Sequence, residues 1–231
     1  MLEVNAVSVS YGKSRIVNNV SFAVDSSEKL AILGRNGVGK TTLLKSMIGL
    51  LPMQTGTLRL GDRNLTAMKA YERACNGISY VPQGREIIPN LTVQENLELG
   101  ALAHTKAVRE RMAEVFDYFP ILPEHLHRKG GVLSGGQQQQ LAIARALMSH
   151  PKVLLLDEPT EGIQPNVVAE IGNILKRIHK TLQIPIVIVE QNLKFARRLA
   201  DRFLIIQKGE IVAGGAMETL SDEIILRYLT V

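Results

Sequence analysis

Three short runs in the second half of the chain are almost wholly apolar, and they constrain the fold more than any other feature. They are residues 153–156, 186–189 and 203–206. Runs of this length without polar alternation are typical of parallel strands covered on both faces. Stretches with helical spacing, 165–182 and 192–200, separate the three runs. The resulting βαβα order predicts an α/β fold built on a mostly parallel sheet.

The first part of the chain has a different pattern. Apolar residues alternate with polar ones from Leu2 to Val9 and again from Ile16 to Val24, with Tyr11 and Gly12 between the two stretches. Alternation interrupted by a turn predicts antiparallel strands. We therefore expect an N-terminal β subdomain beside the parallel sheet.

The segment from residue 93 to about residue 129 has apolar residues at mixed spacings of three and four, which favours helices. We expect a helical insertion there. The domain prediction is accordingly one domain over residues 1–231. In it, residues 1–83 and 131–231 form the core, which includes the N-terminal β subdomain, and residues 84–130 form a helical subdomain.

The composition excludes some classes of protein. The chain has 27 Lys and Arg against 22 Asp and Glu, a net charge of +5, which suits phosphate binding or work near an anionic membrane. Dense basic runs with interleaved aromatics are absent from the sequence, so nucleic acid is not expected as a partner. A single cysteine, Cys75, excludes an intrachain disulfide. Apolar runs stay well short of the ~20 residues needed to cross a bilayer, so any membrane connection is expected through a partner.

A glycine-rich segment follows the short apolar strand expected at residues 29–33 and precedes a helix expected at residues 40–50. It reads Gly34-Arg35-Asn36-Gly37-Val38-Gly39-Lys40-Thr41, which fits the G-x-x-x-x-G-K-[ST] phosphate loop. Its glycines allow successive N–H groups to point at phosphate oxygens. Lys40 offers positive charge to the β and γ phosphates, and the Thr41 hydroxyl is a candidate Mg²⁺ ligand. Strand, loop and helix together predict nucleoside triphosphate binding.

Two carboxylates come at the end of the first apolar run, in Asp157-Glu158. Ligands of parallel α/β sheets gather at the carboxyl ends of the strands. An aspartate there can hold Mg²⁺, and a neighbouring glutamate can deprotonate or orient an attacking water. Neighbours on a strand point to opposite sides, so both can serve one site only if the backbone turns at Glu158. Pro159 makes such an ending plausible.

A second anion site is expected at the start of another helix, where Ser134-Gly135-Gly136-Gln137 precedes the helical pattern 138–149. A serine N-cap followed by two glycines presents free N–H groups at a positive helix end.

The phosphate loop, the segment Leu133 to Gln137 and Asp157-Glu158, in this order, resemble the ATP-binding cassette (ABC) ATPases over nearly the whole chain. The resemblance implies a P-loop NTPase core with a helical insertion, ATP hydrolysis, Mg²⁺ on Asp157 and a catalytic base in Glu158. It also implies a dimer in which residues 134–137 of one subunit close over the nucleotide of the other.

Smaller positions follow from the same resemblance. Tyr11 stands where the family places an aromatic against adenine, and Gln83 where a glutamine reaches Mg²⁺ and the water. Gln191 replaces the usual histidine and Gln164 the usual aspartate. A glutamine amide can still donate to a γ-phosphate, so Gln191 is expected to be catalytic; the alternative is that it only caps the helix 192–200. The residues expected to bind ATP are Tyr11, Gly34, Arg35, Asn36, Gly37, Val38, Gly39, Lys40, Thr41, Thr42, Gln83, Ser134, Gly135, Gly136 and Gln137. The expected metal ligands are Thr41, Gln83 and Asp157.

The segments 189–192 and 158–162 resemble the second ATPase subunit of branched-chain amino acid importers, and 81–86 with 133–141 resemble urea and short-chain amide importers. We therefore expect the ATPase subunit of a membrane importer, with urea or short-chain amides as the first solute and branched-chain amino acids as the alternative. The implied partners are a second ATPase subunit, identical or different, membrane permeases and an external solute-binding protein. The implied location is peripheral, on the cytoplasmic face of the inner membrane. A soluble non-transport cassette ATPase and a scaffold without turnover are the rival hypotheses.

Overall fold

The protein is described by a computed structural model that covers residues 1–102 and 107–230. Its larger sheet has the strand order β10-β9-β3-β8-β7-β6. Five neighbouring strands of this sheet run parallel, and β10 pairs with β9 in the antiparallel sense. The strands are β3 (Lys29–Leu33), β6 (Ile78–Val81), β7 (Val153–Asp157), β8 (Ile186–Glu190), β9 (Arg202–Gln207) and β10 (Glu210–Ala216). The mostly parallel sheet expected from the sequence is confirmed.

The apolar runs are explained by burial on both faces of this sheet. In β7, Leu154 and Leu156 pack into a core beneath the helices, whereas Val153 and Leu155 pack into a second core on the other face. The alternating residues of β3 and β8 divide between the same two cores. Neither face of these strands meets solvent, so no polar alternation appears in the sequence.

The second core lies between the larger sheet and a smaller antiparallel sheet with the order β2-β1-β4-β5. Its strands are β1 (Leu2–Tyr11), β2 (Ser14–Val24), β4 (Thr55–Leu60) and β5 (Arg63–Asn64). The N-terminal β subdomain is therefore present. Helix α1 (Lys40–Met47) contributes Leu43, Leu44 and Met47 to this core.

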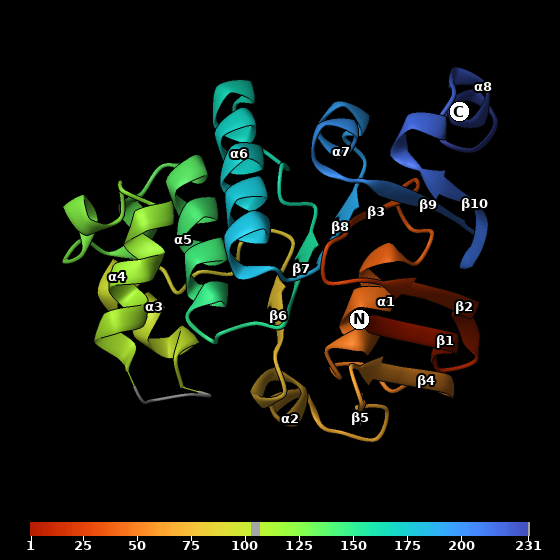
Figure 1. Cartoon of the computed structure of the whole chain (residues 1–231), viewed down its shortest axis with the longest axis horizontal. Helices are drawn as coiled ribbons and strands as arrows, with labels where there is room; N and C mark the ends of the chain where they lie inside the picture. Colours follow the sequence, from red (N-terminus) through yellow and green to blue (C-terminus); the bar gives the residue numbers. More distant parts are fainter. Residues whose placement is uncertain (103–106, 231) are drawn as a thin grey trace.

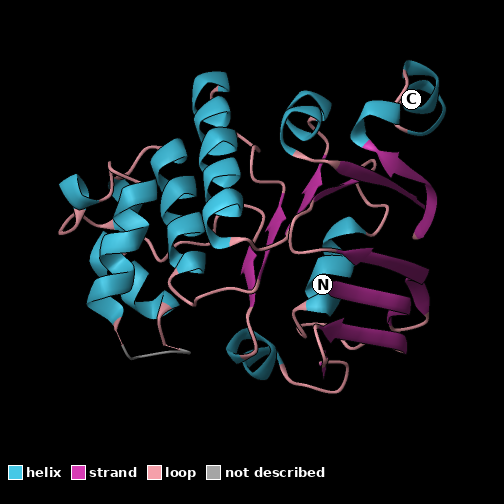
Figure 2. Cartoon of the chain, viewed as in Figure 1, coloured by secondary structure: helices cyan, strands magenta, loops and turns pink. Residues whose placement is uncertain are grey.

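The other helices gather mainly at one side of the molecule, as Figures 1 and 2 show. Helices α3, α4, α5 and α6 stand together there, and the smaller sheet lies on the opposite side. Their bounds are α3 (Val93–Gly100), α4 (Val108–Tyr118), α5 (Gly135–Leu147) and α6 (Pro165–Leu182). The remaining helices are α2 (Ala70–Cys75), α7 (Leu193–Leu199) and α8 (Asp222–Tyr228). The expected insertion 84–130 contains α3 and α4; its residues 103–106 lie outside the described part of the chain.

Several bounds differ from the sequence-based expectation. Helix α1 ends at Met47 rather than Leu50, because Gly49 adopts a left-handed φ of +81° that stops the helix. Helix α5 begins at Gly135, earlier than the expected Gln138, since the Ser134 side chain already caps it. Strand β10 was not expected, because it is an edge strand that is only partly buried, and its apolar stretch is limited to residues 211–213 before two glycines.

Candidate functional site

The phosphate loop joins the end of β3 to the start of α1. Gly39, the last loop residue, has a φ of +107°, and a Cβ there would lie 2.8 Å from the carbonyl oxygen of Ile16. Both the backbone conformation and the close approach to β2 require glycine. The first-turn N–H groups of α1 therefore open onto the loop, as an anion site requires.

Lys40 lies folded across this loop and is only 4% exposed. Its Nζ donates to the carbonyl oxygens of Gly34 at 2.8 Å and Arg35 at 2.9 Å, and lies 3.6 Å from Oε1 of Glu158. Burial lowers the pKa of the Lys40 ammonium, and the Glu158 carboxylate opposes that shift. The side chain thus holds a positive charge at the loop, within contact of the expected catalytic carboxylate.

Asp157 ends β7 with its side chain fully buried. Oδ1 accepts from the Thr41 hydroxyl and Oδ2 from the Tyr80 hydroxyl, both at 3.0 Å. Burial raises the pKa of the Asp157 carboxyl, and the two hydrogen bonds oppose the shift. Thr41 and Asp157 are adjacent hard oxygen donors, so they fit Mg²⁺, which takes few protein ligands and relies on phosphate and water for the rest. Within residues 1–102 and 107–230, no cluster of three or more His, Cys, Asp and Glu side chains suggests another metal site.

Glu158 has a left-handed φ of +47°, so the backbone turns at this residue. Two amides donate to its carboxylate: Gln191 Nε2 to Oε1 at 2.8 Å and Gln83 Nε2 to Oε2 at 3.5 Å. Gln83 also donates to Glu161 at 3.0 Å. The turn places Glu158 on the same side as Asp157 and Lys40. Such a φ in a non-glycine residue costs on the order of 1–3 kcal/mol, which the contacts around it must offset.

Glu190 was not predicted as a site residue, and its side chain joins the loop after β7 to the loop after β8. It is 2% exposed, and its two oxygens accept four hydrogen bonds. Oε1 accepts from the N–H and the hydroxyl of Thr160, and Oε2 from the N–H groups of Gln191 and Asn192. Every acceptor site of an ionised carboxylate is then used. Its position at the end of an apolar strand, like that of Asp157, was the available sequence signal.

Gln191 does not cap the following helix. The N-cap of α7 is Asn192, whose Oδ1 accepts from the Phe195 N–H at 3.1 Å. The capping alternative for Gln191 is therefore wrong, because Asn192 provides that hydrogen bond and the Gln191 amide faces Glu158.

The second expected anion site begins α5. Ser134 and Gln137 form a capping box, in which Ser134 Oγ accepts from the Gln137 N–H at 3.3 Å and Gln137 Oε1 accepts from the Ser134 N–H at 2.9 Å. Gly136 packs tightly, because a Cβ there would lie 2.6 Å from Cγ1 of Val167. Among the described residues, no hydrogen bond joins Ser134–Gln137 to the phosphate loop, and Figure 1 shows α5 and α1 on opposite sides of β6 and β7.

Two further residues singled out from the sequence, Tyr11 and Gln164, lie outside the cluster around Glu158. Tyr11 lies at the β1–β2 turn and is half exposed. Gln164 is the N-cap residue of α6 and makes no side-chain capping bond. In one chain, the structure brings together Lys40, Thr41, Gln83, Asp157, Glu158 and Gln191, with Tyr80 and Glu190 as contacts that sequence reasoning missed.

Residues 17–161 match the family model described as ABC transporter. The high-affinity branched-chain amino acid transport ATP-binding protein BraG of Pseudomonas aeruginosa is 38% identical over 92% of this chain and 91% of that protein. A probable branched-chain amino acid transport ATP-binding protein, LivF of Archaeoglobus fulgidus, is 34% identical over 96% and 94%. The lipopolysaccharide export ATP-binding protein LptB of Escherichia coli is 33% identical over 94% and 92%.

Solved structures agree on the fold. An ATP-binding cassette of an ABC transporter superposes with a TM-score of 0.89 at 26% identity, covering 98% of this chain and 97% of that one. A dimeric cassette in a post-hydrolysis state with bound ADP and Pi superposes with a TM-score of 0.84 at 26% identity, covering 94% and 99%.

Proposed function

We propose that this chain is the energy-supplying subunit of a membrane importer. The premise is that the chain belongs to the ABC transporter family and is an ATPase. The observation that carries the proposal is the position of Glu158. Its carboxylate lies against Lys40, Gln83 and Gln191, beside the buried Asp157. This arrangement serves phosphoryl transfer to water and gives the protein a catalytic base rather than a nucleotide-binding role alone.

The residues divide the work as follows. The N–H groups of the loop 34–39 and the N-terminus of α1 bind the phosphates, and the Lys40 ammonium exchanges its carbonyl partners for the β and γ oxygens. Thr41, Asp157 and Gln83 would hold Mg²⁺. When bound, the metal supplies charge neutralisation on the transferred phosphoryl group. Glu158 accepts a proton from the attacking water, and Gln191 orients the carboxylate or the γ-phosphate with its amide.

The subunit completes its site with a second subunit. Ser134–Gln137 lie away from the phosphate loop of their own chain but present a capped helix N-terminus with two glycines. A second cassette, identical or different, would bring its own copy of this segment over the nucleotide and sandwich two ATP molecules. The dimeric cassette with ADP and Pi supports this arrangement. Residues 84–130 then act as the helical subdomain, and Tyr11 as the adenine platform.

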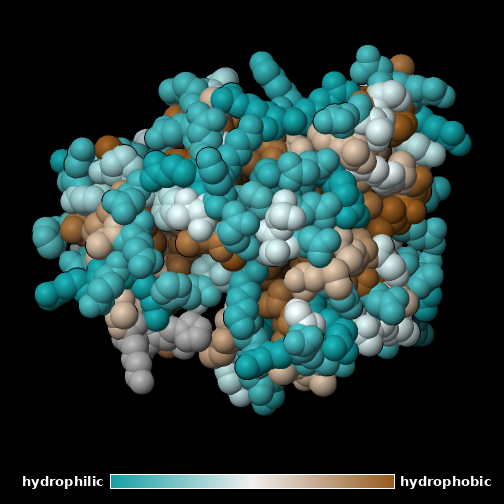
Figure 3. Space-filling model, viewed as in Figure 1, coloured by the Kyte–Doolittle hydropathy of each residue, from teal (hydrophilic) through white to brown (hydrophobic). Residues whose placement is uncertain are grey.

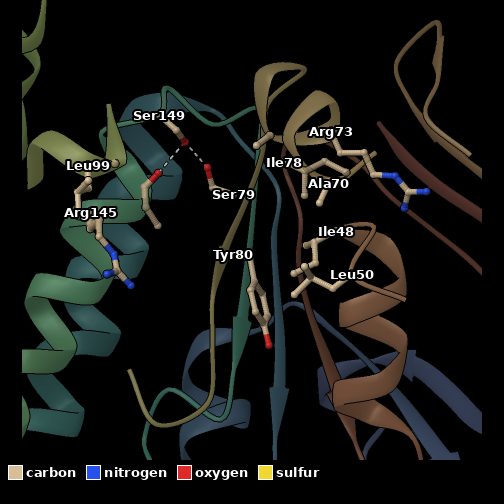
Figure 4. Close-up of a pocket in the computed structure, with 13 residues that line it drawn as sticks. Ile48, Leu50, Ala70, Arg73, Ile78, Ser79, Tyr80, Leu99, Arg145 and Ser149 are labelled. Carbon is tan, nitrogen blue, oxygen red and sulfur yellow. Dashed lines mark hydrogen bonds between the residues drawn. The ribbon is translucent and has the colours of Figure 1, made fainter. Parts of the chain in front are cut away.

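The permease would dock in a groove of about 400 Å³ between the core and the helical side of the molecule. Ile48, Leu50 and Ala70 line one wall, and Leu99 with Arg145 lines the other, as Figure 4 shows. The visible surface in Figure 3 is mostly hydrophilic, with apolar side chains showing between the helical part and the strands. Leu50 is 60% exposed. An apolar partner helix that covered it would remove this side chain from water, which favours binding.

The membrane connection is proposed through this docking. Among the described residues, no helix combines the length and hydropathy needed to span a bilayer. The subunit would then sit peripherally on the cytoplasmic face of the inner membrane. An external solute-binding protein would deliver the solute to the opposite face.

Two solute classes are supported by different observations. The segments 81–86 and 133–141 favour urea or short-chain amides, whereas the similarity to two branched-chain amino acid transport proteins favours those amino acids. An uptake experiment distinguishes them. Cells lacking this chain but keeping its permeases are given the native chain or Glu158→Gln, and uptake of labelled urea, acetamide and leucine is measured.

We expect one solute class to be taken up with the native chain and not with Glu158→Gln. That variant should bind ATP normally and hydrolyse it about 10²–10⁴-fold more slowly, because the base is lost while the phosphate contacts remain. ATP hydrolysis with no effect on the uptake of any solute, and no permease in the purified complex, would favour a soluble cassette ATPase. Native ATP binding without phosphate release would favour a scaffold.

A further inference from the structure

Tyr80 belongs at once to the catalytic centre and to the groove. It lies in β6, next to β7, and its hydroxyl donates to Oδ2 of Asp157 at 3.0 Å. Its ring lines the groove with Ile48, Leu50 and Ile78. Figure 4 shows the ring standing between the two walls, with the hydroxyl at the end that points away from Ser79 and Ser149.

Tyr80 is one of two residues that donate a hydroxyl to the Asp157 carboxylate. The Asp157 side chain is fully buried, and its two oxygens are held by different hydroxyls, Oδ1 by Thr41 and Oδ2 by Tyr80. The Thr41 oxygen is also the proposed metal ligand, so that contact serves the metal directly. The Tyr80 hydroxyl is not a proposed metal ligand. Its contact holds the other carboxylate oxygen, Oδ2. Groups that hydrogen-bond a ligating carboxylate set its geometry, and their removal typically weakens metal binding about 10–100-fold.

The phenol ring is rigid, so its groove edge and its hydroxyl move together. A side chain that packs on the ring in the groove therefore displaces or restrains the hydroxyl on Asp157. This is a direct path between the docking groove and the metal site, and it involves a single side chain.

We propose that Tyr80 is a positioning residue that orients Asp157 for Mg²⁺ and carries contacts made in the groove to that carboxylate. The proposal rests on the proposed function for the metal role of Asp157 and for the permease helix in the groove. The proposed role of Tyr80 does not involve the phosphate-binding residues, which are the loop 34–39 and Lys40, or Glu158. Nucleotide binding without metal is therefore expected to be independent of Tyr80.

The first test is Tyr80→Phe, which removes the hydroxyl and keeps the ring in the groove. Mn²⁺ binding to the ADP complex is followed by electron paramagnetic resonance, and Mg²⁺ by the rise in melting temperature during titration. We expect affinity for either ion to fall about 10–100-fold, with metal-free ADP affinity unchanged. Ser79→Ala is the matched control: it removes a hydroxyl from the neighbouring residue of β6, one bonded to Ser149 instead of Asp157. Its metal affinity should equal that of the native chain.

The second test concerns the groove. The ATPase rate of the purified permease complex is divided by that of the chain alone, at saturating Mg²⁺, for the native chain and for Tyr80→Phe. We expect the native ratio to exceed one and the variant ratio to fall towards one. Unchanged metal affinity in Tyr80→Phe would overturn the positioning role. A native ratio of one, or a ratio that the variant leaves unchanged, would overturn the link to the groove. A chain that hydrolyses ATP but binds no permease would instead contradict the proposed function.

Discussion

At the scale of single residues, Gln191 shows how a substitution in a family position can be understood from its contacts. Its amide donates to Glu158 at 2.8 Å, while its backbone N–H is held by the buried Glu190. The following residue, Asn192, caps α7. The side chain of Gln191 therefore makes no capping hydrogen bond to the helix. It points at Glu158, the carboxylate expected to activate water.

Gln191→Ala should therefore slow hydrolysis and leave stability nearly native. Losing one donor in a preorganised site lowers the single-turnover rate on the order of 10²-fold. Gln191→His should retain much of the rate, since an imidazole N–H can replace the amide donor. Single-turnover rate and melting temperature are measured together.

Asn192→Ala is the control for that experiment. It removes the N-cap of α7 and should lower stability by about 1 kcal/mol with little change in rate. A single-turnover rate in Gln191→Ala equal to that of the native chain would contradict a catalytic role for Gln191.

At the scale of one element, α6 ends under local strain. Gln183, its C-terminal cap, is exposed and has a left-handed φ of +53°, and its Nε2 donates to the Lys180 carbonyl at 2.7 Å. A left-handed conformation costs a residue with a Cβ about 1–2 kcal/mol. The side-chain hydrogen bond offsets part of that cost.

Gln183→Gly should stabilise the protein by about 0.5–1 kcal/mol, because glycine adopts this conformation without the Cβ clash. The larger conformational entropy that glycine loses on folding offsets only part of this gain. For a domain of this size, 1 kcal/mol corresponds to about 2–4 °C in melting temperature. Gln183→Ala keeps the strain and loses the hydrogen bond, so its melting temperature should fall. ATPase activity should stay native in both, since Gln183 is at the end of an 18-residue helix that begins near the site. A lower melting temperature in Gln183→Gly would show that the side-chain bond outweighs the strain.

At the scale of the whole molecule, the groove borders β6, the edge strand of the larger sheet, whereas Asp157 and Glu190 lie at the carboxyl ends of β7 and β8. Pocket residues from α2, α3 and α5 surround β6, which carries Tyr80 and leads directly to Gln83. Binding at the groove can thus be separated experimentally from catalysis, provided that a substitution stays at the rim.

Leu50→Glu is such a substitution. The side chain is 60% exposed, so a charge there should leave the fold and the basal ATPase rate close to native. In a complex with an apolar permease helix, the same charge would be pressed against apolar side chains and lose its water, which should abolish co-purification and uptake. Leu226→Glu, on the exposed face of α8, makes the same change at 67% exposure away from the groove and should have no effect. Equal loss of basal ATPase and uptake in Leu50→Glu would place Leu50 in the catalytic fold rather than at a docking surface.

The sequence by itself determined the architecture and pointed to the residues proposed for the chemistry, because both depend on contiguous residues. The apolar runs at β7, β8 and β9 predict buried parallel strands, and the loop 34–41 carries its own glycines, lysine and threonine. Asp157 and Glu158 were identifiable because they come at the carboxyl end of a buried strand. Elements without such local signals, β10 and the six-residue α2, were missed.

Only the tertiary structure decided which distant residues support that chemistry. Tyr80 meets Asp157 from 77 positions earlier because β6 pairs in register with β7. Glu190 reaches Thr160 across 30 positions because β8 lies beside β7. These contacts, like the groove between α2 and α5, arise from how strands and helices pack against one another. Packing depends on the whole set of buried side chains at once, so no local pattern in the sequence encodes it.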